Sequence, residues 1–220
     1  MGFNLNKDTK IFIAGHKGLI GSAFKRYFDG NKFTNTIVKN RSELDLTSKN
    51  STFNFFQEFE PEIVILAAGK VGGIIQNRDF PLDFINENLL IQLNVFNAAK
   101  EFGVEKLLFF ASSCMYPKNS FEPLKESQIF TGDLEKTSIA YATAKYAGIQ
   151  MCDAYNRQFN SSSFVCVIPN SVYGPNDNFD LASSHVLSAL IRRIHEAKIA
   201  NLTSVTLWGT GSPRREFIYS

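Results

Sequence analysis

The sequence predicts a doubly wound α/β fold, in which helices pack on both faces of a parallel sheet. The first observation is the order of segments, because short apolar runs alternate with helix-length segments along the 220 residues, as in successive βαβ units. The second is the pattern within the runs, which are continuously apolar rather than alternating. Such strands are buried on both faces, which is typical of a parallel, Rossmann-like sheet.

The predicted elements follow one another in a regular order. The run "KIFIAG" at 10–15 opens the sheet, and 19–29 has the length and period of a helix. The segment 162–174 is predicted to be a strand followed by a turn. The other predicted strands are 35–40, 62–69, 106–113 and 205–209, and the other predicted helices are 48–59, 82–102, 139–159 and 184–198.

Two regions are expected along the chain. Residues 1–174 carry the strands and helices of a Rossmann domain, after which Asn, Asp and Ser become frequent. We place the start of a smaller substrate-binding region at 175–220. Its last segment, 214–220, reads as the beginning of a strand with nothing after it to pair with, so we expect this region to be truncated.

The composition excludes several classes of protein. A net charge of +2 is too small to indicate binding to nucleic acid or to a membrane surface. The N-terminus has no signal-peptide pattern, and no run of about 18 apolar residues exists. Cys114, Cys152 and Cys166 show neither CxxC nor metal-ligand spacing, so we expect no metal and a reducing compartment, the cytoplasm.

A glycine-rich segment joins the first predicted strand to the first predicted helix. "IAGHKGLIG" places Gly15, Gly18 and Gly21 there. Glycines allow a tight turn and a close approach of the backbone to a pyrophosphate, and the helix start offers N–H donors. A structural turn is the alternative, but the position in the first βαβ unit favours a dinucleotide loop.

The end of the second predicted strand indicates which dinucleotide binds. Lys39 and Arg41 lie at this tip, and no carboxylate comes before Glu43. A cation suits the 2′-phosphate of NADP, whereas NAD binders place an acid there, so NADP is favoured over NAD. A solvated basic turn is the alternative. Asp45 and Leu46 lie beyond the tip, within reach of the adenine.

Tyr141 and Lys145 are four residues apart in a predicted helix and so share one face. A nearby ammonium, together with the nicotinamide cation, is expected to lower the pKa of the phenol, which then acts as a general acid on a carbonyl. A helix-surface pair is the alternative. Ser112 ends the fourth strand at the carboxyl edge of the sheet, where ligands bind in this fold, and can donate to the same oxygen.

Several segments resemble the extended short-chain dehydrogenase/reductase family, among them "IAGHKGLIGSA", "AAGKVGGI", "SSCMYPK", "YATAKYAG" and "WGTGSPRREF". They are similar to one branch, nucleotide-sugar epimerase/reductases. That resemblance implies an NADP-dependent enzyme that epimerises GDP-4-keto-6-deoxy-D-mannose at C3 and C5, then reduces C4 to give GDP-L-fucose. Ser112, Tyr141 and Lys145 correspond to the reductase residues, and Cys114 and His185 to the acid/base pair of the epimerisation.

Each member of that pair has a simpler interpretation. Cys114 at a strand end can be a small buried apolar residue, and His185 after two serines can belong to a helix cap. By strand alternation, Ser112 and Cys114 are expected to share a face, with Ser113 on the opposite side.

The resemblance also implies binding positions. Those expected at the cofactor are Gly15, His16, Lys17, Gly18, Leu19, Ile20, Gly21, Lys39, Arg41, Asp45, Leu46, Ala67, Ala68, Tyr141, Lys145, Pro169, Asn170, Val172 and His185. Those expected at the GDP-sugar are Ser113, Met115, Asn170, Ser171, Arg193, Trp208 and Arg215. The sequence departs from the family at Lys17, commonly Arg, and at Asn170–Ser171, usually Thr-Asn.

Other functions stay open at this point. A related enzyme reduces a GDP-4-keto-6-deoxy sugar such as a heptose, with or without epimerisation. A nucleotide-binding regulator without turnover and a UDP-sugar 4-epimerase that retains NAD are further alternatives. The helices 82–102 and 141–159 carry more apolar residues than one sheet face requires. The resemblance implies that these helices pair across a two-fold axis, so a homodimer is expected.

Overall fold

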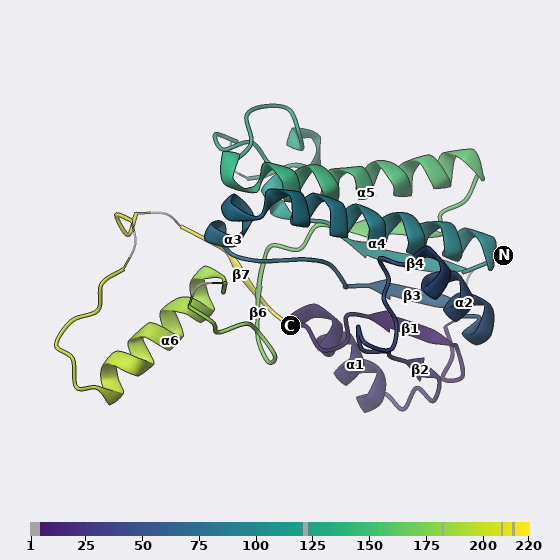
Figure 1. The fold of residues 1–220 in the computed structure, drawn as a ribbon, viewed down its shortest axis with the longest axis horizontal. Helices are drawn as coiled ribbons and strands as arrows, with labels where there is room; N and C mark the ends of the chain where they lie inside the picture. Colours follow the sequence, from purple (N-terminus) through teal and green to yellow (C-terminus); the bar gives the residue numbers. More distant parts are fainter. Residues whose placement is uncertain (1–4, 121–122, 182, 208, 213) are drawn as a thin grey trace.

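A five-stranded parallel sheet forms the centre of the molecule, with strand order β2-β1-β3-β4-β5 (Figure 1). The structure is a computed structural model that describes residues 5–120, 123–181, 183–207, 209–212 and 214–220. The strands are β1 (Ile11–Ala14), β2 (Thr36–Ile37), β3 (Ile63–Leu66), β4 (Lys106–Phe110) and β5 (Phe164–Val167). The predicted doubly wound α/β fold is confirmed.

Two hydrophobic clusters hold helices against the two faces of the sheet. Phe12 and Val64 point to one face, where they join side chains of α2 (Lys49–Phe59), α4 (Pro81–Glu101) and α5 (Ile139–Gln158). The alternate residues of the same strands point to the other face, against α1 (Leu19–Gly30). Because both faces are covered, all four residues of β1 and of β3 are buried.

The predicted helices are confirmed to within a few residues, and local capping explains several of their ends. Ser48 caps α2 by accepting from the Ser51 N–H at 3.3 Å, and Pro81 begins α4, where its missing N–H costs no helical bond. The last long helix is α6 (Val186–Ile199). A short helix, α3 (Ile74–Asp79), and the 3₁₀ turns η1 (Ser113–Met115), η2 (Glu126–Gln128) and η3 (Lys136–Ser138) were not predicted.

The C-terminal third departs from the predictions. The segment 162–174 contains two strands, because Pro169 lacks an N–H to donate and the chain turns away after β5. β6 (Ser171–Tyr173) instead pairs in parallel with β7 (Phe217–Tyr219), so the strand expected within 214–220 is present and has its partner earlier in the chain. The predicted strand 205–209 is also wrong for its described residues, since neither 205–207 nor 209 is in a strand.

Candidate active site

The carboxyl edge of the sheet gathers the predicted catalytic and cofactor residues. Because all five strands are parallel, the loops after β1, β2, β3 and β4 leave the sheet at one edge. The glycine loop follows β1, the basic tip follows β2, and η1 follows β4. Helix α5 packs along α4 over one face of the sheet (Figure 1), and its N-terminal half brings Tyr141 and Lys145 to the end of β4.

The glycine loop is packed so closely that side chains would not fit. Gly15 has a φ of +86°, and a Cβ there would lie 2.8 Å from the Ala68 backbone nitrogen. A Cβ on Gly21 would lie 2.2 Å from the Gly15 carbonyl oxygen. Gly18 begins α1 without a side-chain cap, so the first-turn N–H groups of Leu19 and its neighbours face outward without intrahelical acceptors.

These features fit a dinucleotide pyrophosphate, which needs a close backbone, free N–H donors and a positive helix end. Ala67 and Ala68 form the opposite wall, held by the bond from the Ala67 N–H to the Ala14 carbonyl oxygen at 3.0 Å. His16 lies within the loop, where burial first and then Lys17 lower its pKa. Lys17 itself is exposed.

The tip after β2 carries the two predicted cations in different environments. Arg41 Nη1 lies 2.8 Å from Glu87 Oε1 of α4, and Lys39 Nζ lies 4.8 Å from the centre of the Phe59 ring. The Asp45 carboxylate accepts from the Thr47 N–H and hydroxyl, which lowers the pKa of Asp45. The backbone of the loop is therefore preformed, while the guanidinium remains at the surface.

Ser112, Cys114 and Tyr141 meet at the start of η1. The Ser112 hydroxyl caps this turn by accepting from the Cys114 N–H at 3.3 Å. The same hydroxyl lies close enough to the Tyr141 phenol to lower its pKa, and Cys114 raises that pKa electrostatically. The alternation used to predict a shared face was wrong, because β4 ends at Phe110 and 113–115 is a 3₁₀ turn. Ser112 and Cys114 nevertheless both face Tyr141.

Lys145 is buried directly beneath this cluster. Its Nζ donates to the Phe110 carbonyl oxygen at 2.8 Å and lies 5.8 Å from the centre of the Tyr141 ring. Burial lowers the pKa of Lys145 to about 8. Among the protein's own groups, burial, the largest effect, and Cys114 raise the pKa of Tyr141 more than Ser112 lowers it. The predicted lowering, which also needs the nicotinamide cation, stays a prediction.

His185 is not joined to the other predicted catalytic residues. It is exposed at the N-cap of α6, and no interaction connects it with Cys114 or Tyr141 among the described residues. The preceding Ser183 holds this segment to the loop after β3, since its carbonyl oxygen accepts from the Gly73 N–H at 3.0 Å. The helix start is thus anchored beside the site, while the imidazole points to solvent.

The predicted substrate positions are only partly assembled. Asn170 donates to Glu216 Oε2 at 3.1 Å and accepts from the Ser171 N–H, at the start of the β6–β7 pair that also contains Val172. Pro169 precedes it. Arg193 lies on α6, Arg215 is exposed, and Ser113 is exposed in η1. Met115 is a correction, because its side chain is fully buried in the core and cannot meet a sugar. Trp208 lies outside the described residues.

Sequence reasoning missed the polar residues of α4 that border the site. Asn88 is 1% exposed and donates to the Lys70 and Phe84 carbonyl oxygens, but its Oδ1 has no partner. That Oδ1 lies 2.7 Å from where a Gly69 Cβ would stand, and Lys145 Nζ lies 3.6 Å from the same point. The signal was present, since polar residues interrupt the apolar face of a helix in "NENLLIQLN".

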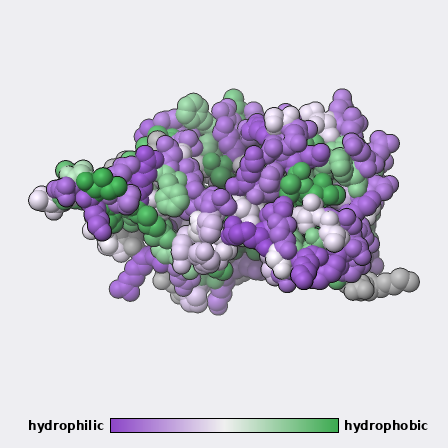
Figure 2. All heavy atoms as spheres, turned by 90° about the horizontal axis from the view of Figure 1, so that it is seen from below, coloured by the Kyte–Doolittle hydropathy of each residue, from purple (hydrophilic) through white to green (hydrophobic). Residues whose placement is uncertain are grey.

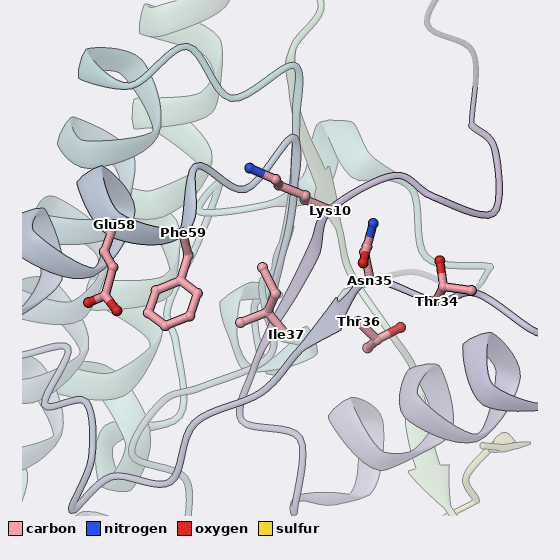
Figure 3. A pocket seen from close by; sticks show the side chains of 7 residues that line it. All are labelled: Lys10, Thr34, Asn35, Thr36, Ile37, Glu58 and Phe59. Carbon is pink, nitrogen blue, oxygen red and sulfur yellow. The ribbon is translucent and has the colours of Figure 1, made fainter.

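A hollow elsewhere on the surface does not belong to this site. It measures about 410 Å³ and is lined by Lys10, Thr34, Asn35, Thr36, Ile37, Glu58 and Phe59 (Figure 3). These residues lie mainly at the amino ends of β1 and β2, opposite the edge where ligands bind in this fold. In the described part of the chain, no three acidic, His or Cys side chains form a metal-binding group, and no helix could span a membrane.

Residues 11–220 match the NAD dependent epimerase/dehydratase family, and the chain belongs to this family. It is 50% identical over 214 residues to GDP-L-fucose synthase 1 of Arabidopsis thaliana, covering 97% of this chain and 66% of that protein. It is 47% identical to the GDP-L-fucose synthase of Sinorhizobium fredii over 100% of this chain and 69% of that protein. The chain thus spans just under two thirds of the Arabidopsis relative.

Among solved structures, the chain is similar to MlghC, a GDP-mannoheptose C4 reductase from Campylobacter jejuni with NADP bound. The TM-score is 0.88 at 37% identity, covering 98% of this chain and 72% of that one. The family resemblance predicted from the motifs is confirmed by these comparisons.

Proposed function

We propose that the protein is an NADP-dependent epimerase/reductase that converts GDP-4-keto-6-deoxy-D-mannose to GDP-L-fucose. The observation that carries the proposal is the cluster at the carboxyl edge, where the Tyr141 phenol meets the Ser112 hydroxyl above the buried Lys145. An open, glycine-lined dinucleotide cradle lies at the same edge. Half-identical relatives named GDP-L-fucose synthase support this choice among nucleotide-sugar reactions.

The reduction requires a proton on the C4 oxygen as that carbon becomes an alcohol. The glycine loop, Arg41 and Lys39 would hold NADPH, which would supply the hydride when bound. Tyr141 stays protonated at neutral pH because its pKa is raised, so it can donate its phenolic proton to the C4 oxygen. Ser112 donates a hydrogen bond to the same oxygen. Lys145 stabilises the phenolate that remains, since a buried cation acts strongly in a low dielectric.

The epimerisation requires proton removal from carbons next to the C4 carbonyl and return to the opposite face. Cys114 lies beside Tyr141, so a base at its Sγ would act next to the oxygen that Ser112 and Tyr141 polarise. His185 is the proposed partner. Because its imidazole points to solvent in this structure, the proposal requires the α6 start to turn inward around the sugar.

Further positions are proposed to hold the GDP-sugar. Arg193 and Arg215 suit the diphosphate and Trp208 an apolar sugar or base face. Ser113, Asn170 and Ser171 line the approach between cofactor and sugar. The proposed division therefore stays at 1–174 for cofactor binding and 175–220 for the substrate region, although β6 and β7 pair across it.

The two half-reactions can be tested separately. Without NADPH, incubation with GDP-4-keto-6-deoxymannose in D₂O should place deuterium at C3 and C5, while added NADPH should be oxidised. Tyr141→Phe should slow reduction by about 10²–10⁴-fold, the usual contribution of a general acid. It should slow the exchange less, because Ser112 still polarises the C4 oxygen. Cys114→Ser should lose exchange. No exchange and no NADPH oxidation in the wild type, despite NADP⁺ binding, would favour a regulator without turnover.

A second candidate is a C4 reductase of a related GDP-4-keto sugar such as a heptose. The similarity to MlghC favours it, and the departures at Asn170 and Ser171 fall where sugar specificity would be set. An assay with a panel of GDP-4-keto sugars distinguishes the two, since reduction of a heptose without exchange would select the second candidate. Tightly bound NAD⁺ in the purified protein would instead point to a UDP-sugar 4-epimerase.

A homodimer is proposed through α4 and α5. Leu82, Leu90 and Leu93 of α4 are 67%, 46% and 46% exposed. A hollow of about 350 Å³ lined by Asn86, Leu89, Leu90 and Leu93 lies on this face. Exposed leucines in a row suit a second copy of the same helix pair.

The cytoplasm is proposed as the compartment, because Cys114, Cys152 and Cys166 are all unpaired thiols.

A further inference from the structure

Helix α4 is joined to the loop after β2 by two contacts of different character. Asn94, which is buried, donates from Nδ2 to the Leu46 and Thr47 carbonyl oxygens, both at 2.9 Å. Seven residues earlier, Glu87 accepts from Arg41 Nη1 at 2.8 Å. Seven residues are close to two helical turns, so both contacts lie on one face of α4. The loop is therefore fixed at Leu46, and an exchangeable ion pair joins it to α4 at Arg41.

Glu87 is the stationary member of this pair. Its side chain is 18% exposed, whereas that of Arg41 is 71% exposed. Lys70, from the loop after β3, also lies 4.0 Å from Glu87 Oε2. Glu87 thus attracts cations from two loops that flank the proposed cofactor groove, while the exposed guanidinium can turn away without disturbing the core.

The pair is weak enough to be exchanged for a phosphate. Exposed ion pairs contribute at most about 1 kcal/mol, and a phosphate offers the guanidinium a bidentate contact with a greater charge. The Glu87 carboxylate opposes phosphate binding in two ways, because it pairs with the Arg41 guanidinium and repels an anion placed beside it. Both effects lower the affinity for NADP.

We propose that Glu87 competes with the 2′-phosphate of NADP for the Arg41 guanidinium, and so limits the affinity for NADP. This inference rests on the proposed NADP dependence. NAD has no 2′-phosphate, so Arg41 stays on Glu87 when NAD binds. Glu87 thereby reduces the preference for NADP over NAD that Arg41 creates.

The test is calorimetric titration of the protein with NADP⁺ and with NAD⁺ at low and high salt. Glu87→Gln should bind NADP⁺ about three-fold more tightly than the wild type, the gain expected from releasing an exposed pair. NAD⁺ affinity should be unchanged, and the gain should shrink at high salt. Asp83→Asn is the matched control, because Asp83 lies one turn earlier and pairs with Lys70 at 3.5 Å, not with Arg41. It should leave NADP⁺ affinity within the error of the wild type.

Arg41→Ala separates failure of this inference from failure of the proposed function. If the wild type binds NADP⁺ no better than NAD⁺, the proposed cofactor is wrong. If Arg41→Ala abolishes a wild-type preference for NADP⁺ but Glu87→Gln binds NADP⁺ equally or more weakly, the role of Glu87 alone is overturned. An Arg41→Ala/Glu87→Gln double variant should gain less than three-fold over Arg41→Ala, because only the repulsion between Glu87 and the phosphate is then removed. A full three-fold gain in that background would also overturn competition for Arg41.

Discussion

At the residue scale, the environment of a side chain decides its chemistry more than its type does. Lys145 is an ordinary residue of an amphipathic pattern in the sequence, yet the fold buries it to 5% exposure beside a carbonyl oxygen. Its pKa falls from 10.5 to about 8 because burial disfavours the charge. The charged form of Lys145 therefore lowers the stability of the fold at neutral pH. Strongly shifted pKa values of this kind are typical of functional sites.

Because the buried charge of Lys145 lowers stability, Lys145→Met should change how the stability depends on pH. The unfolded lysine keeps its pKa near 10.5, so wild-type stability should be lost as pH falls from 10.5 through about 8, by about 3 kcal/mol. Methionine carries no charge and should lack this loss. Urea denaturation measures the free energy of unfolding. The variant's value minus the wild-type value should be about 3 kcal/mol larger at pH 7 than at pH 10.5, because only the wild type loses stability at the lower pH. Parallel pH dependences would contradict the buried charge. Reduction of the keto sugar should be lost at every pH.

At the element scale, the turn between β1 and α1 shows why the glycine spacing matters. Gly15 and Gly21 are required by close packing, since a Cβ on either would meet backbone atoms at 2.9 Å or less. Gly18 has more room, because its nearest contact would be an ordinary 3.5 Å. The motif therefore combines two packing glycines with one at the open start of the helix.

Gly21→Ala should consequently weaken NADP⁺ binding by at least about ten-fold, because the Gly15 carbonyl must move out of the cradle to admit a methyl group. Gly30→Ala is the control in the same helix, since a Cβ there would meet nothing within 4 Å. Calorimetric titration with NADP⁺ measures both. Equal affinities in the two variants would show that the turn does not form the pyrophosphate cradle.

At the scale of the whole molecule, exposed apolar residues occur on several elements, and two of these surfaces make a useful comparison. One is the outer side of α4, proposed as the dimer face. The other is the region of α6 and the segment after it, where apolar side chains gather at the protruding end of the molecule (Figure 2). The exposed apolar residues there are Ile191, Ile194, Ile199, Leu202 and Leu207.

The two surfaces can be compared by charge substitution. Leu90→Glu with Leu93→Glu should convert a dimer to a monomer, because two carboxylates would be buried against their copies across the two-fold axis. Leu202→Glu, also on exposed apolar surface, should leave the dimer intact. Light scattering gives the mass, which should be 24.7 kDa for the double variant. A wild-type mass of 24.7 kDa would contradict the dimer.

Several features were determined by the sequence alone. The continuous apolar runs and their spacing predicted the parallel sheet and the five long helices, because hydrophobic periodicity reports local burial directly. Short motifs predicted the glycine loop and the candidate residues Tyr141, Lys145 and Ser112. Each motif consists of residues a few positions apart, so it can be found in the sequence. The family resemblance, carried by short contiguous segments, was likewise readable without a structure.

Only the tertiary structure decided features that depend on distant segments. β7 pairs with β6 from more than forty residues away, which no local pattern indicates. The raised pKa of Tyr141 and the lowered pKa of Lys145 follow from burial in the fold rather than from their four-residue spacing. The Arg41–Glu87 contact joins loop and helix across 46 positions. Charge, burial and strand pairing are properties of the assembled neighbours, so the chemistry of the site was settled only by folding.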